Sequence, residues 1–566
     1  MNFIHTELWG VLGMFLITML CAIPLGKYIA LAFSNQSGNV LNRIFDPVEK
    51  TILRFSGIDG SKEMTWKEHL YALLTINMLW FILVMLVLMF QGNLPLNPDG
   101  NPGMSADLAF NTAISFVVNC NLQHYSGETG VSYLGQTVLM FLQFVSAGVG
   151  IAAAIVLFNA FKDKNSHALG NFYVLFLKSC TRILLPISFL VALILLFQGV
   201  PMTYEGKDQI INLQGDTVAV SRGPVAAFVA IKHVGTNGGG FFGANSNHPL
   251  ENPTYLTNMV EMIAQFVIPV AMVFAFGYYI KRRKLSLMIF GVMTFGFLCL
   301  AIPNVVMESQ GSPALASMGI DQTSGAMEGK EVRIGAAASG FWSIVTTVIS
   351  TGSINSMHDS SMPLSGMNEL LAMMINAFYG GNGVGLLNFF IFIILAVFIS
   401  GLMVGRTPEF LGKKVEAREM KIAMLIALLH PFLILTGTAM AAAFPNIGAQ
   451  TANDPGFHGF SEMLYEFTSA AANNGSGFEG LGDNTPWWNI STGIVLLLGR
   501  FLPIIGPIAI AGLLAEKRYV PESAGTLPTD TGSFGFMVFA VIAIVAALAF
   551  FPALTLGPIA EYFSIQ

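Results

Sequence analysis

Four uncharged polar turns interrupt a sequence that is otherwise strongly apolar. They read NCN (119–121), TNGGG (236–240), STGS (350–353) and NNGS (473–476), and successive turns are 114 to 123 residues apart when counted between Cys120, Gly238, Gly352 and Gly475. Rings of backbone carbonyl oxygens in such turns can replace the hydration shell of K⁺. None of the turns contains a carboxylate, the ligand that Ca²⁺ and Mg²⁺ prefer. One such turn alone would be an ordinary loop, but four at a regular spacing predict a neutral cage for a monovalent cation.

Each turn lies in a segment, rich in Gly, Ser, Asn and Thr, that is too short to cross a membrane. The four segments cover residues 112–128, 230–246, 346–362 and 468–484. Irregular backbone at membrane depth is tolerated only where protein or water surrounds it. We therefore expect four re-entrant segments around one polar cavity. Each should carry a short helix whose partially negative C-terminal end lies near the cage and favours a cation.

The elements that hold these segments must be membrane helices. Hydrophobic residues make up 54% of the 566 residues and charged residues only 11%, against about 25% charged in ordinary soluble domains. A transmembrane helix needs about 20 apolar residues, and ten stretches qualify: 8–33, 68–90, 131–161, 170–198, 254–280, 286–306, 368–405, 419–444, 485–514 and 533–560. The first is longer than the roughly 7 to 15 apolar residues of a cleavable signal, so we expect it to be retained.

The composition also excludes several kinds of site. A net charge of −6 leaves no basic footprint for nucleic acid. The four cysteines have no CxxC spacing, so they indicate neither a zinc site nor a disulfide framework. The chain contains neither the phosphate-binding pattern GxxxxGK[ST] nor the phosphorylation motif DKTGT. ATP hydrolysis therefore cannot reside in this chain, and the turns lack the nucleophile, metal or acid–base pair of a membrane enzyme.

The cationic residues predict the sidedness of the spans. Twenty-one of the 27 lysine and arginine residues fall in alternate gaps between the ten stretches. The positive-inside rule assigns these gaps to the cytoplasm and puts both termini on the extracytoplasmic side.

The repeat of span, turn and span predicts the fold class. Because every repeat contains two spans, successive repeats keep one orientation, and their common axis runs along the membrane normal. We expect an all-α polytopic membrane protein with ten transmembrane helices, arranged as four pseudo-symmetric membrane-pore-membrane repeats around a central ion filter, plus one extra N-terminal helix. The expected division is 1–66 (N-terminal helix and cytoplasmic loop), 67–165, 166–285, 286–418 and 419–566 (repeats 1 to 4).

Two features inside the spans need an explanation. Arg500 follows the aromatic pair at Trp487 and Trp488 by about 13 residues, which places it roughly 20 Å deep at 1.5 Å per residue. It is either a positive barrier below the filter or part of a structural ion pair. The seventh stretch contains Gly380, Gly381 and Gly383, so we expect the helix to break there, because interior glycine costs about 1 kcal/mol relative to alanine. The break serves tight packing, a gate or a lateral opening.

Four charged residues flank the turns: Lys232, Glu251, Asp359 and Glu369. Acidic side chains at an outer mouth could concentrate cations. Solvated charges at the rim of a vestibule are an equally good interpretation.

Four longer motifs carry a family resemblance. They are GTNGGGFFGANSNHPLENPT (235–254), MHDSSMPLSGM (357–367), GLMVGRTPEFLGKKVEARE (401–419) and TSAAANNGSGFEGLGDNTP (468–486). Together they resemble the potassium-binding A subunits of bacterial Kdp potassium-transporting P-type ATPases, over essentially the whole chain. This family belongs to a superfamily of potassium transporters built from four membrane-pore-membrane units.

The resemblance implies that the chain binds and translocates K⁺ across the inner membrane of a bacterium, as the channel-like subunit of an ATP-driven pump. It implies no cofactor in this chain, since ATP and Mg²⁺ are handled by the catalytic subunit (KdpB), and it implies KdpC, the small KdpF subunit and lipids as further partners. The alternative is an autonomous K⁺ channel or ion-coupled K⁺ carrier of the same superfamily. Physical reasoning on the turns alone fits both.

The resemblance also implies roles for individual residues. The filter would be formed by Asn119, Cys120, Asn121 and Gln123 in the first repeat, Thr236, Asn237 and Gly238 in the second, Ser350, Thr351 and Gly352 in the third, and Asn473, Asn474 and Gly475 in the fourth. Cys120 stands where the family usually has Thr, and Thr351 where it often has Cys, so ion binding through either side chain is in doubt. Because the first turn lacks glycine, we expect an asymmetric cage. Arg406 and Arg500 would act as cytoplasmic-side barriers, although an interfacial arginine also explains Arg406.

Overall fold

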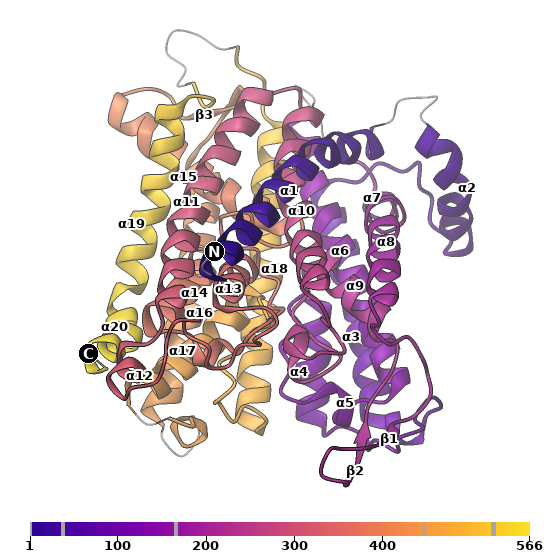
Figure 1. The fold of residues 1–566 in the computed structure, drawn as a ribbon. Coiled ribbons are helices and arrows are strands. Elements are labelled where there is room, and N and C mark those ends of the chain that lie inside the picture. Colours follow the sequence, from indigo (N-terminus) through magenta and orange to yellow (C-terminus); the bar gives the residue numbers. More distant parts are fainter. Residues whose placement is uncertain are drawn as a thin grey trace.

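The computed structural model describes residues 3–34, 40–162, 168–444, 448–454, 456–521 and 528–565. Within these ranges, ten helices are long and apolar enough to span a membrane. They are α1 (Phe3–Ala32), α3 (Trp66–Phe90), α6 (Tyr133–Lys162), the continuous α7–η2–α8 (Phe172–Lys178, Ser179–Leu184, Leu185–Phe197), α10 (Tyr255–Tyr279), α11 (Arg283–Gln310), α15 (Val384–Val404), α16 (Ala417–Ala443), α18 (Pro486–Glu516) and α19 (Gly532–Leu556). The ten predicted spans are confirmed, and the chain is a multi-pass helical membrane protein (Figure 1).

The seventh predicted span, 368–405, is divided into two helices. α14 (Pro363–Ile375) ends at Asn376, which has a left-handed backbone with φ +43°, and α15 starts only after Gly383. Gly380 and Gly383 have φ of +63° and +80°, which a helix cannot contain. The predicted break is therefore confirmed, and α15 alone makes the crossing.

Four shorter helices lie among the long ones. They are α4 (Ala106–Val117), α9 (Val225–Gly235), α13 (Ala336–Val348) and α17 (Phe457–Ala472). Each begins before the re-entrant segment predicted for it and ends one or two residues before a polar turn. Their side chains are almost entirely buried, including charged residues such as Lys232 of α9 and Glu462 of α17.

Several small elements were not expected. The amphipathic helix α2 (Val40–Phe55) lies in the first loop, where Asp46 and Glu49 bind Arg182 of η2. The hairpin of β1 (Asp208–Ile211) and β2 (Thr217–Val220) is antiparallel and pairs Asp208 with Val220. The remaining elements are η1 (Gln91–Asn93), α5 (Gly127–Gly130), η3 (Asn245–Asn247), α12 (Pro313–Ser317), η4 (His358–Ser360), β3 (Glu409–Phe410), β4 (Lys413–Lys414), η5 (Ala449–Thr451) and α20 (Pro558–Ser564).

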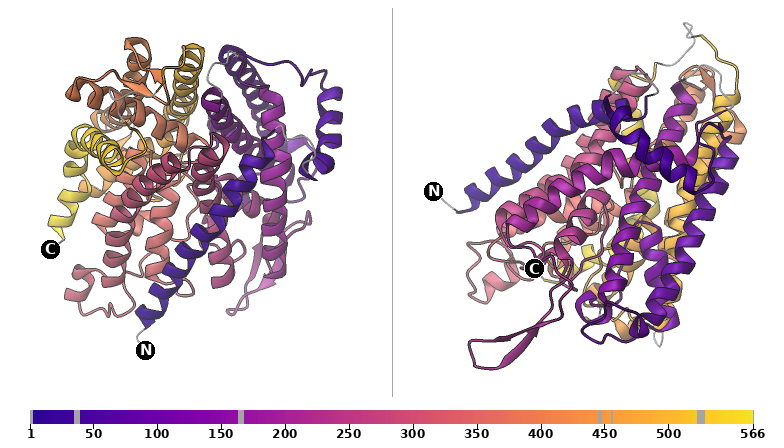
Figure 2. Two further views of the ribbon diagram at one scale, coloured as in Figure 1. Left: turned by 90° about the horizontal axis from the view of Figure 1, so that it is seen from above. Right: turned by 90° about the vertical axis from the view of Figure 1, so that its right-hand side faces the viewer.

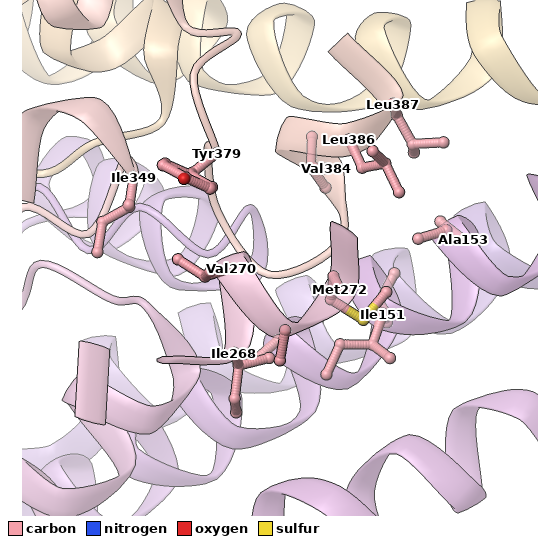
Figure 3. Packing of buried hydrophobic residues seen from close by; sticks show 14 of the residues in the cluster. Ile151, Ala153, Ile268, Val270, Met272, Ile349, Tyr379, Val384, Leu386 and Leu387 are labelled. Atoms are coloured by element: carbon pink, nitrogen blue, oxygen red, sulfur yellow. The ribbon is translucent and has the colours of Figure 1, made fainter. Parts of the chain in front are cut away.

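The arrangement of the bundle follows the order of the chain. Seen from above, the helices of the first third of the chain gather on one side and those of the last third on the other (Figure 2). α1 runs obliquely across the bundle and packs on α10, where Gly26 leaves no room for a side chain against Phe274. Buried residues of α6, α10 and α15, such as Ile151, Val270 and Leu387, form the core next to the broken span (Figure 3).

The division of the chain into an N-terminal part and four repeats stays a prediction. Its boundary at residue 165 lies outside the described residues. The observed elements agree in order with this division, since each of the four short helices lies between two long ones along the chain.

Candidate functional site

The four short helices all end in the same way. The residue at or just after each helix end has a left-handed backbone, with φ between +49° and +62°: Asn119, Thr236, Ser350 and Asn473. This conformation is uncommon for residues other than glycine and asparagine, and Thr236 is β-branched, for which it is an outlier. Four segments far apart in the sequence thus share one unusual exit from a helix.

The turns that follow these helix ends meet in the interior of the bundle. The backbone N–H of Gly238 donates a hydrogen bond to the carbonyl oxygen of Cys120 at 2.9 Å. A Cβ atom placed on Gly238 would lie 2.8 Å from that oxygen, 2.9 Å from Cα of Gly475 and 3.0 Å from the carbonyl oxygen of Asn474. Gly352 approaches Asn474 equally closely from the third turn. All four turns therefore come into direct contact.

Glycine is required at these contacts for two reasons. No side chain fits between the turns, and Gly352 and Gly475 also have φ of +81° and +107°. The corresponding residue of the first turn is Asn121, with φ +65°. Asparagine tolerates this conformation better than other side-chain-bearing residues, which explains how the first turn follows the same path without glycine.

Asparagine amides connect the turns to their neighbours. Asn119 donates from Nδ2 to the carbonyl oxygens of Gly235 and Thr236 at 3.1 and 2.9 Å, and so joins the first turn to the second. Asn474 donates to the carbonyl oxygen of Thr346, which lies in the last turn of α13, at 2.8 Å. These bonds hold adjacent helix ends in a fixed relation.

Two further asparagines bind the long helices around the turns. Asn237 donates to the carbonyl oxygen of Gln143 on α6 at 3.1 Å, and Asn473 donates to that of Leu496 on α18 at 3.1 Å. Four of the five predicted filter asparagines, all except Asn121, thus use their side-chain N–H groups structurally.

Some buried polar atoms at the turns have no partner within the described part of the chain. They include both side-chain atoms of the Asn121 amide, Oδ1 of Asn237 and the hydroxyl of Thr351. Buried polar groups are almost always hydrogen-bonded, so each of these oxygens could serve as a ligand for a dehydrated cation. Gln123 differs, because its amide accepts from the N–H of Gly240 and donates to the carbonyl oxygen of the same residue.

Charged residues lie behind the second turn rather than at its rim. Lys232 and Glu251 are fully buried, and their charged atoms are 2.6 Å apart. Nζ of Lys232 also donates to Oδ1 of Asn245 at 2.7 Å, while Nδ2 of Asn245 donates to the carbonyl oxygen of Gly238 at 2.5 Å. Glu369 is also fully buried. The interpretation of these three charges as a solvated rim is therefore wrong, because none of the three side chains is exposed to solvent.

The chain between α14 and α15 contacts the turns. The backbone N–H of Asn382 donates to Oγ1 of Thr236 at 3.1 Å, and its side chain donates to the carbonyl oxygen of Val234 at 2.8 Å. Oδ1 of Asn376 accepts from the Ser350 hydroxyl at 2.9 Å. The loop 376–383 therefore packs against the ends of α9 and α13, and Gly381 faces Thr236 at van der Waals distance.

Arg500 lies close to this loop. It is 6% exposed within α18, and a Cβ atom on Gly150 would be 3.3 Å from its Nη2 atom. The same position on Gly150 also contacts the carbonyl oxygen of Asn382. Among the residues that the structure describes, no carboxylate lies within ion-pair distance of Arg500, and its role as a barrier stays a prediction.

The other predicted barrier residue lies elsewhere. Arg406 follows the C-terminal end of α15, and its N–H donates to the carbonyl oxygen of Gly401 at 2.8 Å. At 1.5 Å per residue, it is roughly 30 Å along the helix from the loop at Gly383. The fold does not bring Arg406 to the turns.

Two polar groups next to the turns carry a signal of function in the sequence. These groups are Lys232, the one lysine of helix α9, and Asn382, which lies between Gly381 and Gly383. A charged or strongly polar side chain is costly in a membrane segment, and this cost is a signal of function. His124 had no such signal. No motif around His124 in the sequence indicates a role for it. In the fold, its Nε2 lies 3.0 Å from Glu466 of α17 and its Nδ1 lies 2.7 Å from Oδ1 of Asn489.

The fold and the site first define a class: helical multi-pass membrane proteins in which four short helices and their turns meet inside the bundle. The chain is similar in fold to the solved potassium transporter TrkH from Vibrio parahaemolyticus, with a TM-score of 0.52 and 14% sequence identity. The similarity covers 89% of this chain and 98% of that chain.

The sequence comparisons are more specific. Residues 12–563 match the family described as KdpA, the potassium-transporting ATPase A subunit, and the chain belongs to this family. Proteins named potassium-transporting ATPase potassium-binding subunit from Flavobacterium psychrophilum, Phocaeicola vulgatus and Geobacillus kaustophilus are 69%, 56% and 46% identical to it. These matches cover 98 to 99% of this chain and 98 to 100% of the relatives. The family resemblance is thereby confirmed.

Proposed function

We propose that this chain binds K⁺ and passes it across the cytoplasmic membrane of a bacterium, as the channel-like subunit of an ATP-driven uptake pump. The observation that carries the proposal is the contact of four uncharged turns at the C-terminal ends of four buried helices. Family membership supports the same function, since the relatives are named for potassium binding within a potassium-transporting ATPase.

The proposed ion ligands are oxygens of the four turns, together with the partially negative helix ends. The carbonyl oxygens of Cys120 and Asn474 lie where the turns touch, and the hydroxyl of Thr351 is buried without a partner in the described structure. Neutral oxygens suit a weakly hydrated monovalent ion, because such a cage offers dipoles and no full charge. K⁺ is the transported ion here, and the proposed transport function needs no cofactor in this chain.

The proposed barrier against passive leakage is Arg500 with the loop 376–383. Both lie next to Gly150, on the side of the turns where the short helices end. A positive charge at that depth repels a cation that has left the filter, because screening is weak away from water. An active pump needs such a block, since an open pore would dissipate the gradient that it builds.

We place the energy source on a partner. The catalytic subunit KdpB would hydrolyse ATP with Mg²⁺, and KdpC and KdpF would complete the assembly. A cavity between α15, α16, α18 and α19 is lined by Asn376 of the loop and by Asn388, His430 and Gly499. We propose this side of the bundle for the approach of the catalytic subunit. Both termini are proposed to be extracytoplasmic.

The test is to produce the chain with and without the catalytic subunit and to measure K⁺ uptake and K⁺-dependent ATP hydrolysis at micromolar K⁺. Uptake that requires the partner and ATP supports the pump subunit. Strong uptake by the isolated chain would instead establish the alternative, an autonomous channel or ion-coupled carrier. A variant of the partner that binds but cannot hydrolyse ATP is the matched control, because it keeps the assembly and removes only the energy.

A further inference from the structure

A second group of chemically able side chains lies away from the four turns. Asp359 of η4 and His458 and Glu462 of α17 each offer one ligand atom, and these atoms lie within 4.8 Å of one another. His458 and Glu462 are four residues apart on one helix, so their side chains share a face. Glu462 precedes Asn473 by eleven residues, which places the group about 16 Å from the fourth turn along α17.

Glu462 has a position that requires an explanation. It is fully buried, and neither of its carboxylate oxygens has a hydrogen-bond partner among the described residues. An isolated buried carboxylate is costly, and such groups are normally paired or bound to a metal ion. Its neighbours Asp359 and His458 face the same space, so the carboxylate is directed into the group.

His458 is oriented as a metal ligand is. Its Nδ1 lies 2.9 Å from Oε1 of Glu561 on α20, and its Nε2 lies 3.1 Å from Oδ1 of Asp359. Metal-bound histidines almost always donate their other ring N–H to a carboxylate or carbonyl group. Glu561 fills that position. Nε2 faces Asp359, so the ring is hydrogen-bonded to a carboxylate on each side, and a metal ion would bind at Nε2 in place of its proton. The ring also stacks on Phe478, with centroids 5.7 Å apart and planes 10° apart.

Gly480 leaves the space between the carboxylates of Asp359 and Glu462 free of a side chain. A Cβ atom on Gly480 would lie 2.8 Å from Oδ2 of Asp359 and would also contact Oε1 of Glu462. Only glycine fits at this position, so no side chain comes between the two acids.

A second histidine–carboxylate group is formed by His124 with Glu466 and Asp483. In both groups each ring nitrogen of the histidine has an oxygen partner, and for His124 these partners are Asn489 and Glu466. The two groups differ in their buried glutamate. Glu466 is hydrogen-bonded to His124, whereas neither carboxylate oxygen of Glu462 has a partner among the described residues.

We propose that Asp359, His458 and Glu462 form a binding site for a divalent transition-metal ion of the zinc type, with Glu561 as the residue that positions His458. Zn²⁺ accepts imidazole nitrogen and carboxylate oxygen in one site and often keeps water as the fourth ligand, whereas Ca²⁺ and Mg²⁺ take oxygen ligands. The bound ion would join η4, α17 and α20. It does not touch the four turns, so its role is to hold the N-terminal end of α17 in place.

The test uses the full chain purified in its complex, treated with EDTA and then titrated with ZnCl₂ by calorimetry. We expect one Zn²⁺ per chain, and an anomalous scattering peak at the zinc edge between the three side chains. Glu462→Gln and His458→Gln should each abolish the binding, while Glu561→Gln should weaken it about 10- to 100-fold, as loss of a positioning partner does.

Glu466→Gln is the matched control, because it changes the same residue type one helical turn further along α17. It should leave zinc binding unchanged. Binding that survives both Glu462→Gln and His458→Gln would overturn the proposal, as would the absence of any zinc binding to the wild-type complex. Calcium binding with no response to zinc would also overturn it, because the histidine would then have no role. If a variant fails to assemble, Asp359→Asn at the more exposed ligand gives the same comparison.

Discussion

The ammonium nitrogen of Lys232 lies 2.6 Å from a carboxylate oxygen of Glu251, and both side chains are fully buried behind the second turn. The same nitrogen binds Asn245, whose amide contacts the carbonyl oxygen of Gly238. A charged pair thereby fixes the backbone of a proposed ion ligand without touching the ion.

Removal of one partner of this pair should therefore damage both stability and selectivity. Glu251→Gln leaves Lys232 buried without a countercharge, which typically costs about 3 to 5 kcal/mol. We expect a lower midpoint of thermal unfolding, and weaker discrimination of K⁺ from Rb⁺ in cation-dependent ATP hydrolysis by the complex. Lys62→Met is the control, because it removes the exposed pair between Lys62 and Glu68, worth about 0 to 1 kcal/mol. Equal effects of the two substitutions would refute a special role for the buried pair.

Gly238 should be intolerant of any side chain. In Gly238→Ser the new Cβ atom would press on the carbonyl oxygens of Cys120 and Asn474 and on Gly475. We expect the turns to separate and the preference for K⁺ over Na⁺ and Rb⁺ to fall, measured as the concentration of each ion that half-activates ATP hydrolysis. Gly291→Ser on α11 is the control, since a Cβ atom there has no neighbour within 4 Å. Unchanged selectivity in Gly238→Ser would count against the filter role of this turn.

The spacing of the turns and the apolar stretches were sufficient to predict the ten spans, the four short helices and the break before α15. These features are visible in sequence because they depend on local composition and on helix length. The left-handed conformation of Thr236 was not predictable, since its β-branched side chain disfavours that conformation. Contacts with Asn382, 146 residues away, accompany it.

The partners of buried charges were also beyond prediction from the sequence. A charged residue is normally interpreted as exposed to solvent unless its partner is known. Partners such as Glu49 and Arg182 are 133 residues apart, so the sequence does not reveal them. The family resemblance assigns Asn119 and Asn474 to the filter, and in the structure their side-chain N–H groups bind backbone oxygens of neighbouring helices. Only the folded structure shows which side-chain amides bind backbone oxygens and which have an oxygen without a partner that could face an ion.

The pair of Arg182 and Glu49 should control the attachment of α2. Arg182 is fully buried and donates to both carboxylate oxygens of Glu49, at 2.7 and 2.6 Å, and to Asp46 at 2.8 Å. We expect Glu49→Gln to loosen α2 from η2, and hydrogen exchange across residues 42–55 to become faster while exchange in α6 stays unchanged. Lys50→Gln is the control on the same helix, because its ion pair with Asp46 is exposed. Unaltered exchange in Glu49→Gln would show that apolar contacts alone hold the helix.

Arg500 should block passive flow through the site. Because no described carboxylate neutralises it, its charge acts on whatever cation leaves the turns, and Arg500→Ala removes that repulsion. We expect K⁺ to leak through the assembled complex in proteoliposomes without ATP, and ATP hydrolysis to continue with little net uptake. Arg500→Lys keeps the charge and should restore most of the coupling, while the exposed Arg54→Ala should behave as the wild type. Tight coupling in Arg500→Ala would leave the loop 376–383 as the barrier, because that loop is the other element packed directly against the turns.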